Sequence, residues 1–252
     1  MKRKRKDSLM IEIKDLYKNF GSKEVLRGVN LIIEPGETIV IIGRSGCGKS
    51  VLIKHIVGLL TPDKGYVRVE DKIVHELSLN ELYELRKKFG FLFQGAALFD
   101  SMTVEENVAL PLIESYNHYS MKEVRKIVEE KLELVGLSGV LNLKPAELSG
   151  GMKKRVGLAR ALVTNPSYIL YDEPTTGLDP IMSDSIDQLI KELADKLKVT
   201  SVVVTHDMYS VKNVAKKVAM MNDGIIYFVG KPDELLNSKD KVIMDFIRRT
   251  EV

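Results

Sequence analysis

The feature that most constrains this chain is a glycine-rich loop with a fixed spacing of small and charged residues. Residues 43–50 read GRSGCGKS, after the apolar run 38–42 and at the start of a helix-like segment, KSVLIKHIVGLL. Glycines let the backbone bend around an anion, so that successive N–H groups and the helix N-terminus face phosphate oxygens. A glycine loop formed by chance is the alternative. The flanking strand and helix favour phosphate binding, because the G-x-x-x-x-G-K-[ST] pattern requires that context.

Two side chains of this loop are expected to bind the phosphates and the metal ion. Lys49 would place its charge on the β and γ phosphates, and the Ser50 hydroxyl would complete a Mg²⁺ shell. The predicted nucleotide contacts are Gly43, Arg44, Ser45, Gly46, Cys47, Gly48, Lys49, Ser50 and Val51. The loop alone leaves the reaction open, because adenylate-type kinases and GTPases share it.

Two adjacent carboxylates follow a second apolar run. The run SYILYD begins at Ser167 and ends at Asp172, and Glu173 follows directly. A Mg²⁺ ion held by Ser50 requires a carboxylate at the end of a neighbouring strand, and Asp172 fits that position. Glu173 is expected to orient or deprotonate a water for in-line attack on the γ-phosphate. A solvated turn before Pro174 is the alternative, but two acids at the end of an apolar strand indicate that something binds there.

Strand-like and helix-like patterns alternate along the chain. Residues 10–33 read as an antiparallel β layer, whereas residues 37–43 read as a central strand buried on both faces. The remaining expected elements are hairpins turning at Glu70-Asp71 and Asp223-Gly224, helices over 103–147, 182–197, 232–238 and 240–249, and parallel strands from Ser167 and Thr200. This order predicts an α/β fold, with a parallel-sheet core, an antiparallel β subdomain and a helical insertion.

Composition narrows the class of protein. The chain has 252 residues, 44% hydrophobic and 29% charged, which is ordinary for a water-soluble globular protein. Its apolar runs are far shorter than the ~20 residues of a membrane-spanning helix. The basic start, residues 2–6, lacks the apolar segment of an export signal. The single cysteine, Cys47, cannot form an internal disulfide, which fits a reducing compartment. The net charge of +3 gives no indication of a nucleic-acid partner.

A second glycine-containing helix start identifies the family. Residues 148–162 read LSGGMKKRVGLARAL, in which Ser149, Gly150 and Gly151 form another anion-binding helix N-terminus. Here the chain resembles the ABC ATPases, whose signature motif LSGGQ stands at the head of a helix. The resemblance extends from about Met10 to Gly230 with the motifs in family order. It implies the P-loop NTPase fold, ATP as substrate, Mg²⁺ as cofactor, and head-to-tail pairing in which each signature completes the ATP site of a second copy.

The resemblance assigns roles to four further residues. Tyr17 falls where the family stacks an aromatic ring on adenine, although a tyrosine on a strand can be purely structural. Gln94 matches the glutamine that contacts Mg²⁺ or the attacking water. Asp179 matches the loop across the dimer seam, and His206 matches the switch histidine near the γ-phosphate. Glu173, His206 and Gln94 are therefore the expected catalytic residues, with Ser50, Gln94 and Asp172 at the metal.

Met152 stands where the family usually has glutamine, and it cannot donate the hydrogen bonds of an amide. Together with residues 43–65 and 93–112, this departure resembles the ATPases of Mla-type, Mce-associated phospholipid transporters. That likeness implies a membrane permease, an MCE lipid-binding protein and, in some systems, a STAS-domain subunit as partners, at the cytoplasmic face of the inner membrane. Residues 96–99 would form an apolar patch for the permease, with core packing as the alternative.

The expected function is to power a separate permease, with phospholipid as the cargo. The alternatives are another cargo, or a soluble ABC protein that acts on nucleic acid or ribosomes. The expected organisation is a basic arm over residues 1–9, an ATPase domain over 10–230 and a C-terminal helical extension over 231–252, with the helical subdomain at approximately 95–163.

Overall fold

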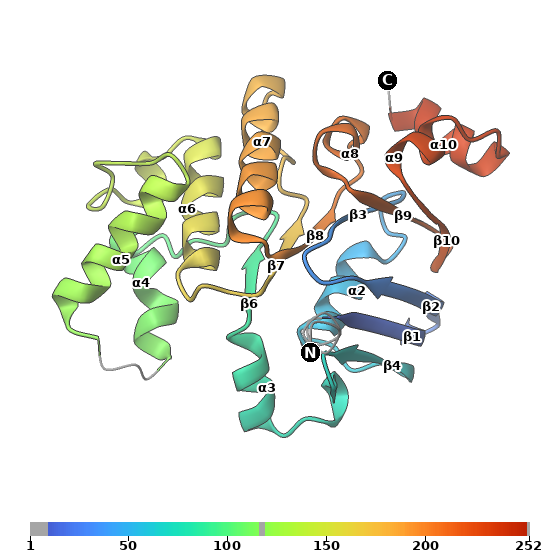
Figure 1. The fold of residues 1–252 in the computed structure, drawn as a ribbon, viewed down its shortest axis with the longest axis horizontal. Helices are drawn as coiled ribbons and strands as arrows, with labels where there is room; N and C mark the ends of the chain where they lie inside the picture. Colours follow the sequence, from blue (N-terminus) through green and yellow to red (C-terminus); the bar gives the residue numbers. More distant parts are fainter. Residues whose placement is uncertain (1–9, 116–118, 251–252) are drawn as a thin grey trace, which may run out of the picture.

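The computed structural model describes residues 10–115 and 119–250 of the chain (Figure 1). The predicted basic arm, residues 1–9, lies outside them, as do the last two residues of the predicted extension. The helices are α2 (Lys49–Ile56), α3 (Leu79–Arg86), α4 (Val104–Glu114), α5 (Met121–Leu134), α6 (Gly150–Leu162), α7 (Pro180–Leu197), α8 (Met208–Val214), α9 (Pro232–Leu236) and α10 (Lys241–Thr250). Among the residues described, none of these helices is long and apolar enough to cross a membrane.

The strands form two sheets. The first is antiparallel, with the order β2-β1-β4-β5, and the second has the order β10-β9-β3-β8-β7-β6. In the second sheet β9, β3, β8, β7 and β6 run parallel, and β10 joins its edge as the second strand of a hairpin. The strands are β1 (Ile11–Phe20), β2 (Lys23–Ile33), β3 (Thr38–Ile42), β4 (Lys64–Val69), β5 (Lys72–Ile73), β6 (Phe89–Leu92), β7 (Tyr168–Asp172), β8 (Thr200–Val204), β9 (Lys217–Asn222) and β10 (Ile225–Gly230).

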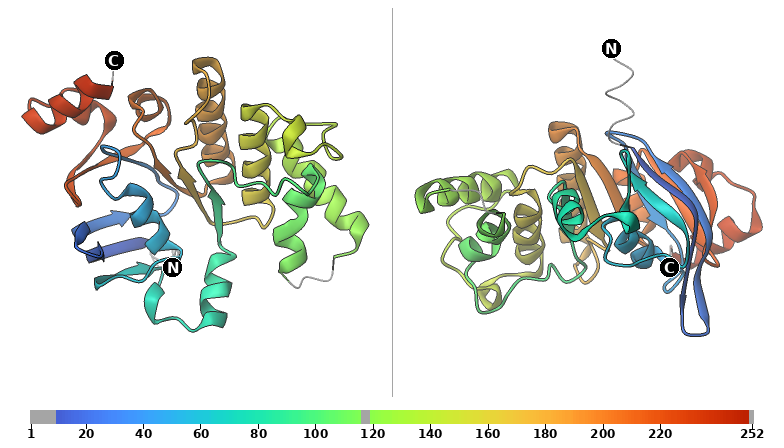
Figure 2. Two further views of the ribbon diagram at one scale, coloured as in Figure 1. Left: turned by 180° about the vertical axis from the view of Figure 1, so that it is seen from behind. Right: turned by 90° about the horizontal axis from the view of Figure 1, so that it is seen from below.

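Alternation along β3 explains how the sheet sits between two cores. Ile39 and Ile41 pack with α2 and the antiparallel sheet, whereas Val40 and Ile42 pack with the helices α4 to α8. All five residues of β3 are buried, as a strand covered on both faces requires. The α/β class with an antiparallel layer and a helical insertion is therefore confirmed. Figures 1 and 2 show α4 and α5 at one end of the molecule and the antiparallel sheet at the other.

Several boundaries differ from the expectation. The helix after the glycine loop ends at Ile56 rather than at residue 60, because Gly58 takes a left-handed conformation with φ +65°. The predicted helical stretch 103–147 contains two helices, α4 and α5, and then a largely irregular segment that ends in a short 3₁₀ turn at Pro145–Glu147. Helix α3 was not expected. The signal for it is the capping box in which Ser78 and Glu81 satisfy each other's backbone N–H groups.

Both hairpin turns lie where they were predicted. β4 pairs with β5 across Glu70 and Asp71, and β9 pairs with β10 across Asp223 and Gly224.

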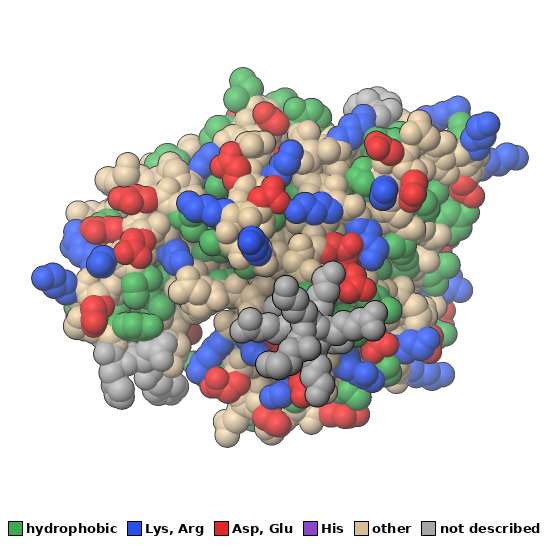
Figure 3. All heavy atoms as spheres, in the orientation of Figure 1, with side chains coloured by type: hydrophobic (Ala, Val, Ile, Leu, Met, Phe, Trp, Pro, Cys, Tyr) green, Lys and Arg blue, Asp and Glu red, His purple; other side chains and the backbone are tan. Residues whose placement is uncertain are grey.

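Charged side chains of both signs are intermixed on the face seen in Figure 3.

Candidate nucleotide-binding and hydrolysis site

The glycine loop joins the buried strand β3 to helix α2. Gly48 is the N-cap of α2 in a left-handed conformation, φ +106°, and no side chain caps the helix. The first N–H groups of α2 are therefore left for a ligand. A Cβ at Gly43 would lie 2.5 Å from the carbonyl oxygen of Met221 and 2.6 Å from Cys47 Sγ, so only glycine fits there. Lys49 Nζ donates to the carbonyl oxygen of Gly43 at 2.8 Å, which folds this buried cation back over its own loop.

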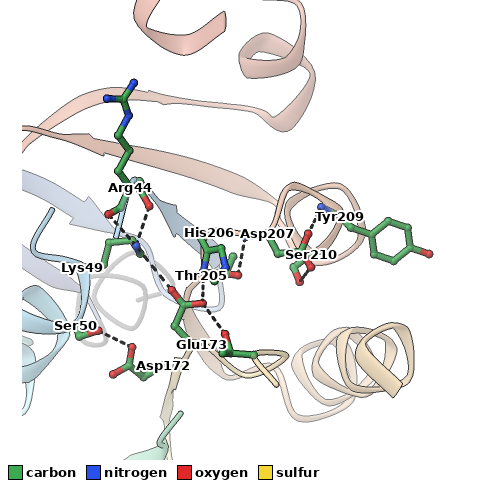
Figure 4. Close-up of polar contacts among 12 residues, drawn as sticks. Arg44, Lys49, Ser50, Asp172, Glu173, Thr205, His206, Asp207, Tyr209 and Ser210 are labelled. Atoms are coloured by element: carbon green, nitrogen blue, oxygen red, sulfur yellow. Dashed lines mark hydrogen bonds and ion pairs between the residues drawn. The ribbon is translucent and has the colours of Figure 1, made fainter. Parts of the chain in front are cut away.

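The predicted acidic residues meet the loop at the end of β7 (Figure 4). Ser50 Oγ donates to Asp172 Oδ1 at 2.8 Å. Burial raises the pKa of Asp172, and the hydrogen bond from Ser50 partly offsets that effect. A hydroxyl and a carboxylate oxygen at this separation form a pair of hard donors of the kind that Mg²⁺ prefers.

Glu173 lies at the centre of the cluster. Its Oε1 is 3.8 Å from Lys49 Nζ, and its Oε2 is 2.9 Å from His206 Nδ1. When the carboxylate is the acceptor in this bond, the proton lies on Nδ1 of His206. Glu173 has φ +50°, uncommon for a residue other than glycine. Its N–H donates to the carbonyl oxygen of Val204 at 2.8 Å, and this bond fastens the strained residue to β8.

A cavity of 680 Å³ opens in front of this cluster. Gln94, which is exposed, is one of the residues that line it. Its full lining is Phe20, Lys23, Val25, Arg44, Ser45, Gly46, Gly48, Lys49, Ser50, Val51, Gln94, Glu173, His206, Phe246, Arg249 and Thr250. Cys47 is not among these residues. It lines a separate, smaller hollow, and burial raises the pKa of its thiol.

The aromatic residue that β1 places at the cavity is Phe20 rather than Tyr17, the residue expected from the sequence. Tyr17 does not line the cavity; its hydroxyl lies over Gly28, and its ring is 5.9 Å from the Lys64 ammonium. Register shifts before and after Tyr17 in the β1–β2 pairing change which residues of β1 share a face. Phe20, at the end of β1 and 47% exposed, therefore presents its ring to the cavity instead.

Sequence reasoning missed the contribution of α10. Phe246, Arg249 and Thr250 line the cavity, and Asp245 forms ion pairs with Arg44 of the phosphate loop and with Arg249. The sequence predicted a helix over residues 240–249. It carried no signal of what this helix would pack against.

The second helix N-terminus is arranged differently. Ser149 is the N-cap of α6, and its Oγ accepts from the N–H of Met152 at 3.3 Å. Ser149 and Gly150 are exposed, while Gly151 packs against Met182 of α7. None of these residues lines the cavity at the phosphate loop. Asp179, also exposed, caps α7 by accepting from the N–H of Met182 at 2.9 Å.

The predicted apolar patch 96–99 is only partly a surface. Ala96 is buried, and Leu98 packs on the core, so for these two residues core packing prevails. Ala97 and the half-exposed Phe99 line a separate groove of 420 Å³ together with Phe93 and residues of α3, α4 and α6.

Comparison with known proteins agrees with this geometry. The family described as ABC transporter matches residues 26–176. The chain is 43% identical over 237 residues to the probable ribonucleotide transport ATP-binding protein mkl of Mycobacterium leprae, covering 94% of this chain and 68% of that protein. It is 40% identical over 239 residues to the intermembrane phospholipid transport system ATP-binding protein MlaF of Haemophilus influenzae, covering 95% and 90%. It is also 43% identical over 238 residues to the methionine import ATP-binding protein MetN of Clostridioides difficile, covering 94% and 74%.

Two solved structures resemble the fold. One is the ATP-binding cassette MJ0796 in a dimeric, post-hydrolysis state bound to ADP and Pi, with TM-score 0.81 and 37% identity, covering 88% of this chain and 98% of the other. The other is cbiO1 from Clostridium perfringens, part of the ABC transporter complex cbiONQ, with TM-score 0.83 and 30% identity, covering 97% and 98%. The chain therefore belongs to the ABC transporter ATP-binding family and is an ATP-hydrolysing subunit of that class.

Proposed function

We propose that the 680 Å³ cavity binds Mg²⁺·ATP, that Glu173 is the general base for hydrolysis, and that two copies close around two nucleotides to drive a phospholipid permease. The observation that carries the proposal is the position of Glu173. It is held between Lys49 and His206, next to the Ser50–Asp172 pair. A carboxylate in this place can take a proton from a water that attacks the γ-phosphate, while His206 keeps it oriented.

The donor set fits Mg²⁺. Within residues 10–115 and 119–250, no three His, Cys, Asp or Glu side chains cluster as a metal cage. Mg²⁺ usually binds one or two protein oxygens and completes its shell with substrate phosphates and waters. Ser50, Asp172 and the exposed amide of Gln94 would hold it here, and the ion would neutralise charge on the β and γ phosphates.

Pairing of two copies is supported by the N-terminus of α6, the signature end, which does not line the phosphate-loop cavity of its own chain. Ser149 and Gly150 lie exposed at the head of α6, outside the cavity that the phosphate loop forms. A second chain, placed head to tail, gives this helix end a γ-phosphate to bind. ATP then shifts the population toward the closed pair, and hydrolysis releases it.

A separate permease is proposed to dock in the 420 Å³ groove. Its lining includes the apolar residues Phe93, Phe99 and Pro111 and the basic residues Arg86 and Lys87. The groove adjoins Gln94, so a bound permease element would lie beside the residue proposed at the metal. In this arrangement the chain is peripheral on the cytoplasmic face of the membrane.

Phospholipid is the proposed cargo because MlaF matches over 90% of its own length and Met152 departs from the usual signature. An MCE lipid-binding protein and a STAS-domain subunit are the further partners that the MlaF likeness favours. The names of mkl and MetN point instead to ribonucleotides and methionine. Mass spectrometry of lipids that copurify with the intact membrane complex tests the choice. Bound methionine or nucleotide cargo in place of phospholipid would contradict it.

A variant of Glu173 tests the catalytic assignment. Glu173→Gln keeps the size of the side chain but removes the base, and we expect turnover to fall by roughly 100-fold or more while ATP binding persists. The ATP-loaded variant should elute as a dimer in size-exclusion chromatography. Glu129→Gln, on the exposed face of α5, is the matched control. Undiminished hydrolysis by the Glu173 variant would show that another group is the base.

A further inference from the structure

A lysine of α6 reaches from the signature helix into the hydrolysis site of its own chain. Lys154 is 5% exposed, although it carries a charge. Its ammonium donates to the carbonyl oxygen of Gln94 and to that of Glu173, the latter at 3.3 Å. These acceptors lie 60 and 19 residues away in sequence, so a single side chain joins three segments of the chain.

Burying such a cation is costly unless it is paired. The charges of Glu173 and Asp172 oppose the effect of burial, which on its own lowers the pKa of Lys154. Two of the three ammonium donors are used by backbone carbonyls. Backbone acceptors fix where a loop runs, so the contacts of Lys154 set the path of the chain at Gln94 and Glu173.

The same helix also holds the rest of the loop after Gln94. Arg160 donates from Nη2 to the carbonyl oxygen of Ala96 and from Nη1 to that of Ala97, both at 2.7 Å. Ala96 and Ala97 have φ values of +61° and +49°, so this loop is strained and needs external support. Helix α6 therefore grips both ends of the segment 94–97.

We propose that Lys154 is a positioning residue for ATP hydrolysis, which holds the backbone of Gln94 and Glu173 in fixed relation to α6. The proposal rests on the roles proposed above for those two residues. Lys154 lies five residues after Ser149, about 7.5 Å along the helix axis. A phosphate bound at the head of α6 and the base at Glu173 are thereby linked through one rigid helix, so that each ATP site of a pair senses the other.

The test compares Lys154→Met with Lys126→Met, an exposed lysine of α5 that receives the same substitution. Turnover is measured per nucleotide-binding site, so that any unfolded fraction is removed from the result. We expect Lys154→Met to lower kcat by about tenfold or more while KM for ATP changes less than about threefold, because alignment for the reaction is lost and binding is not. Lys126→Met should match the wild type in both.

A double variant separates positioning from general damage. Because Lys154 acts in part through Gln94, Lys154→Met should lower kcat by a factor at least about threefold smaller in a Gln94→Ala background than in the wild type. If Lys154→Met does not yield folded protein, Lys154→Gln, which keeps an N–H donor, replaces it in both backgrounds. An equal loss in the two backgrounds, a matching rise in KM, or a wild-type kcat would overturn the proposal.

The Glu173→Gln result distinguishes this failure from failure of the proposed function. An inactive Glu173→Gln together with a fully active Lys154→Met rejects only the positioning role. An active Glu173→Gln rejects the catalytic assignment on which that role depends.

Discussion

The N-termini of α2 and α6 both begin at a glycine-containing loop, but the chain completes only one of them as a site. At α2, the cap is Gly48 without a capping side chain, and a lysine, two carboxylates and a histidine converge in front of it. At α6, the cap is Ser149, which satisfies one N–H of its own helix and faces solvent. The cap residue thus distinguishes the two helices. The N-terminus of α2, capped by Gly48, is ready to bind a ligand within one chain, whereas the N-terminus of α6, capped by Ser149, needs a second chain to complete a site.

The largest expected effect is at the complete end. Lys49→Ala removes the buried cation at the phosphate loop, and we expect a loss of roughly 100-fold or more in turnover together with weakened ATP binding. Equilibrium binding of a fluorescent ATP analogue and phosphate release measure the two effects. Lys122→Ala, at the exposed start of α5, is the control. ATP binding of wild-type strength in Lys49→Ala would place the phosphates elsewhere.

At the incomplete end, Ser149→Arg should leave ATP binding within about threefold and lower hydrolysis by roughly 50-fold, because the bulk and charge disturb only a shared site. Mixing this variant with Lys49→Ala provides a sharper test. In a head-to-tail pair, one of the two sites then combines an intact phosphate loop from one chain with an intact signature from the other. Activity of the mixture well above that of either variant alone is expected. Its absence at concentrations that support pairing would argue that each site lies within one chain.

The complete end was also the part that the sequence could predict. Spacing in GRSGCGKS and two acids after an apolar strand identify residues whose roles depend on local geometry. Phe20 was missed because bulges in β1 alter which residues share a face, and bulges leave no reliable mark in an apolar pattern. The position of α10 was missed for another reason. Its amphipathic pattern shows that one face is buried, whereas only the tertiary structure brings Arg249 to the cavity and Asp245 to Arg44.

A smaller effect distinguishes the two aromatic residues of β1. Phe20→Ala should raise KM for ATP about tenfold, since an aromatic ring stacked on a base contributes roughly 1–3 kcal/mol. Tyr17→Ala should leave KM within about twofold, because its ring lies outside the cavity. Measurement of KM for both variants at saturating Mg²⁺ decides between them. A larger change in the Tyr17 variant would restore the role first expected for it.

The smallest effect concerns the packing of α7 against α8, which lies between the signature end and the phosphate-loop end of the chain. Helix α7 begins beside the signature, α8 follows His206, and Asp187 lies fully buried on α7. The pKa of Asp187 is raised to about 7: burial is the largest cause, a hydrogen bond from Ser210 opposes it, and the charges of Asp207 and Asp184 add to it.

Because the folded state binds this proton more tightly than the unfolded state, the stability contributed by Asp187 is lost as pH rises from about 4 toward 7. Asp187→Asn removes that loss. In urea titrations, the free energy of unfolding of Asp187→Asn minus that of the wild type should be about 2 kcal/mol larger at pH 8 than at pH 5. Turnover should change little. Asp195→Asn, at an exposed ion pair, should show no such difference between the two pH values. If the difference in unfolding free energy between Asp187→Asn and the wild type is the same at both pH values, the Asp187 carboxyl is ionised in the folded protein at pH 5 as well as at pH 8. Its burial between α7 and α8 then does not raise its pKa.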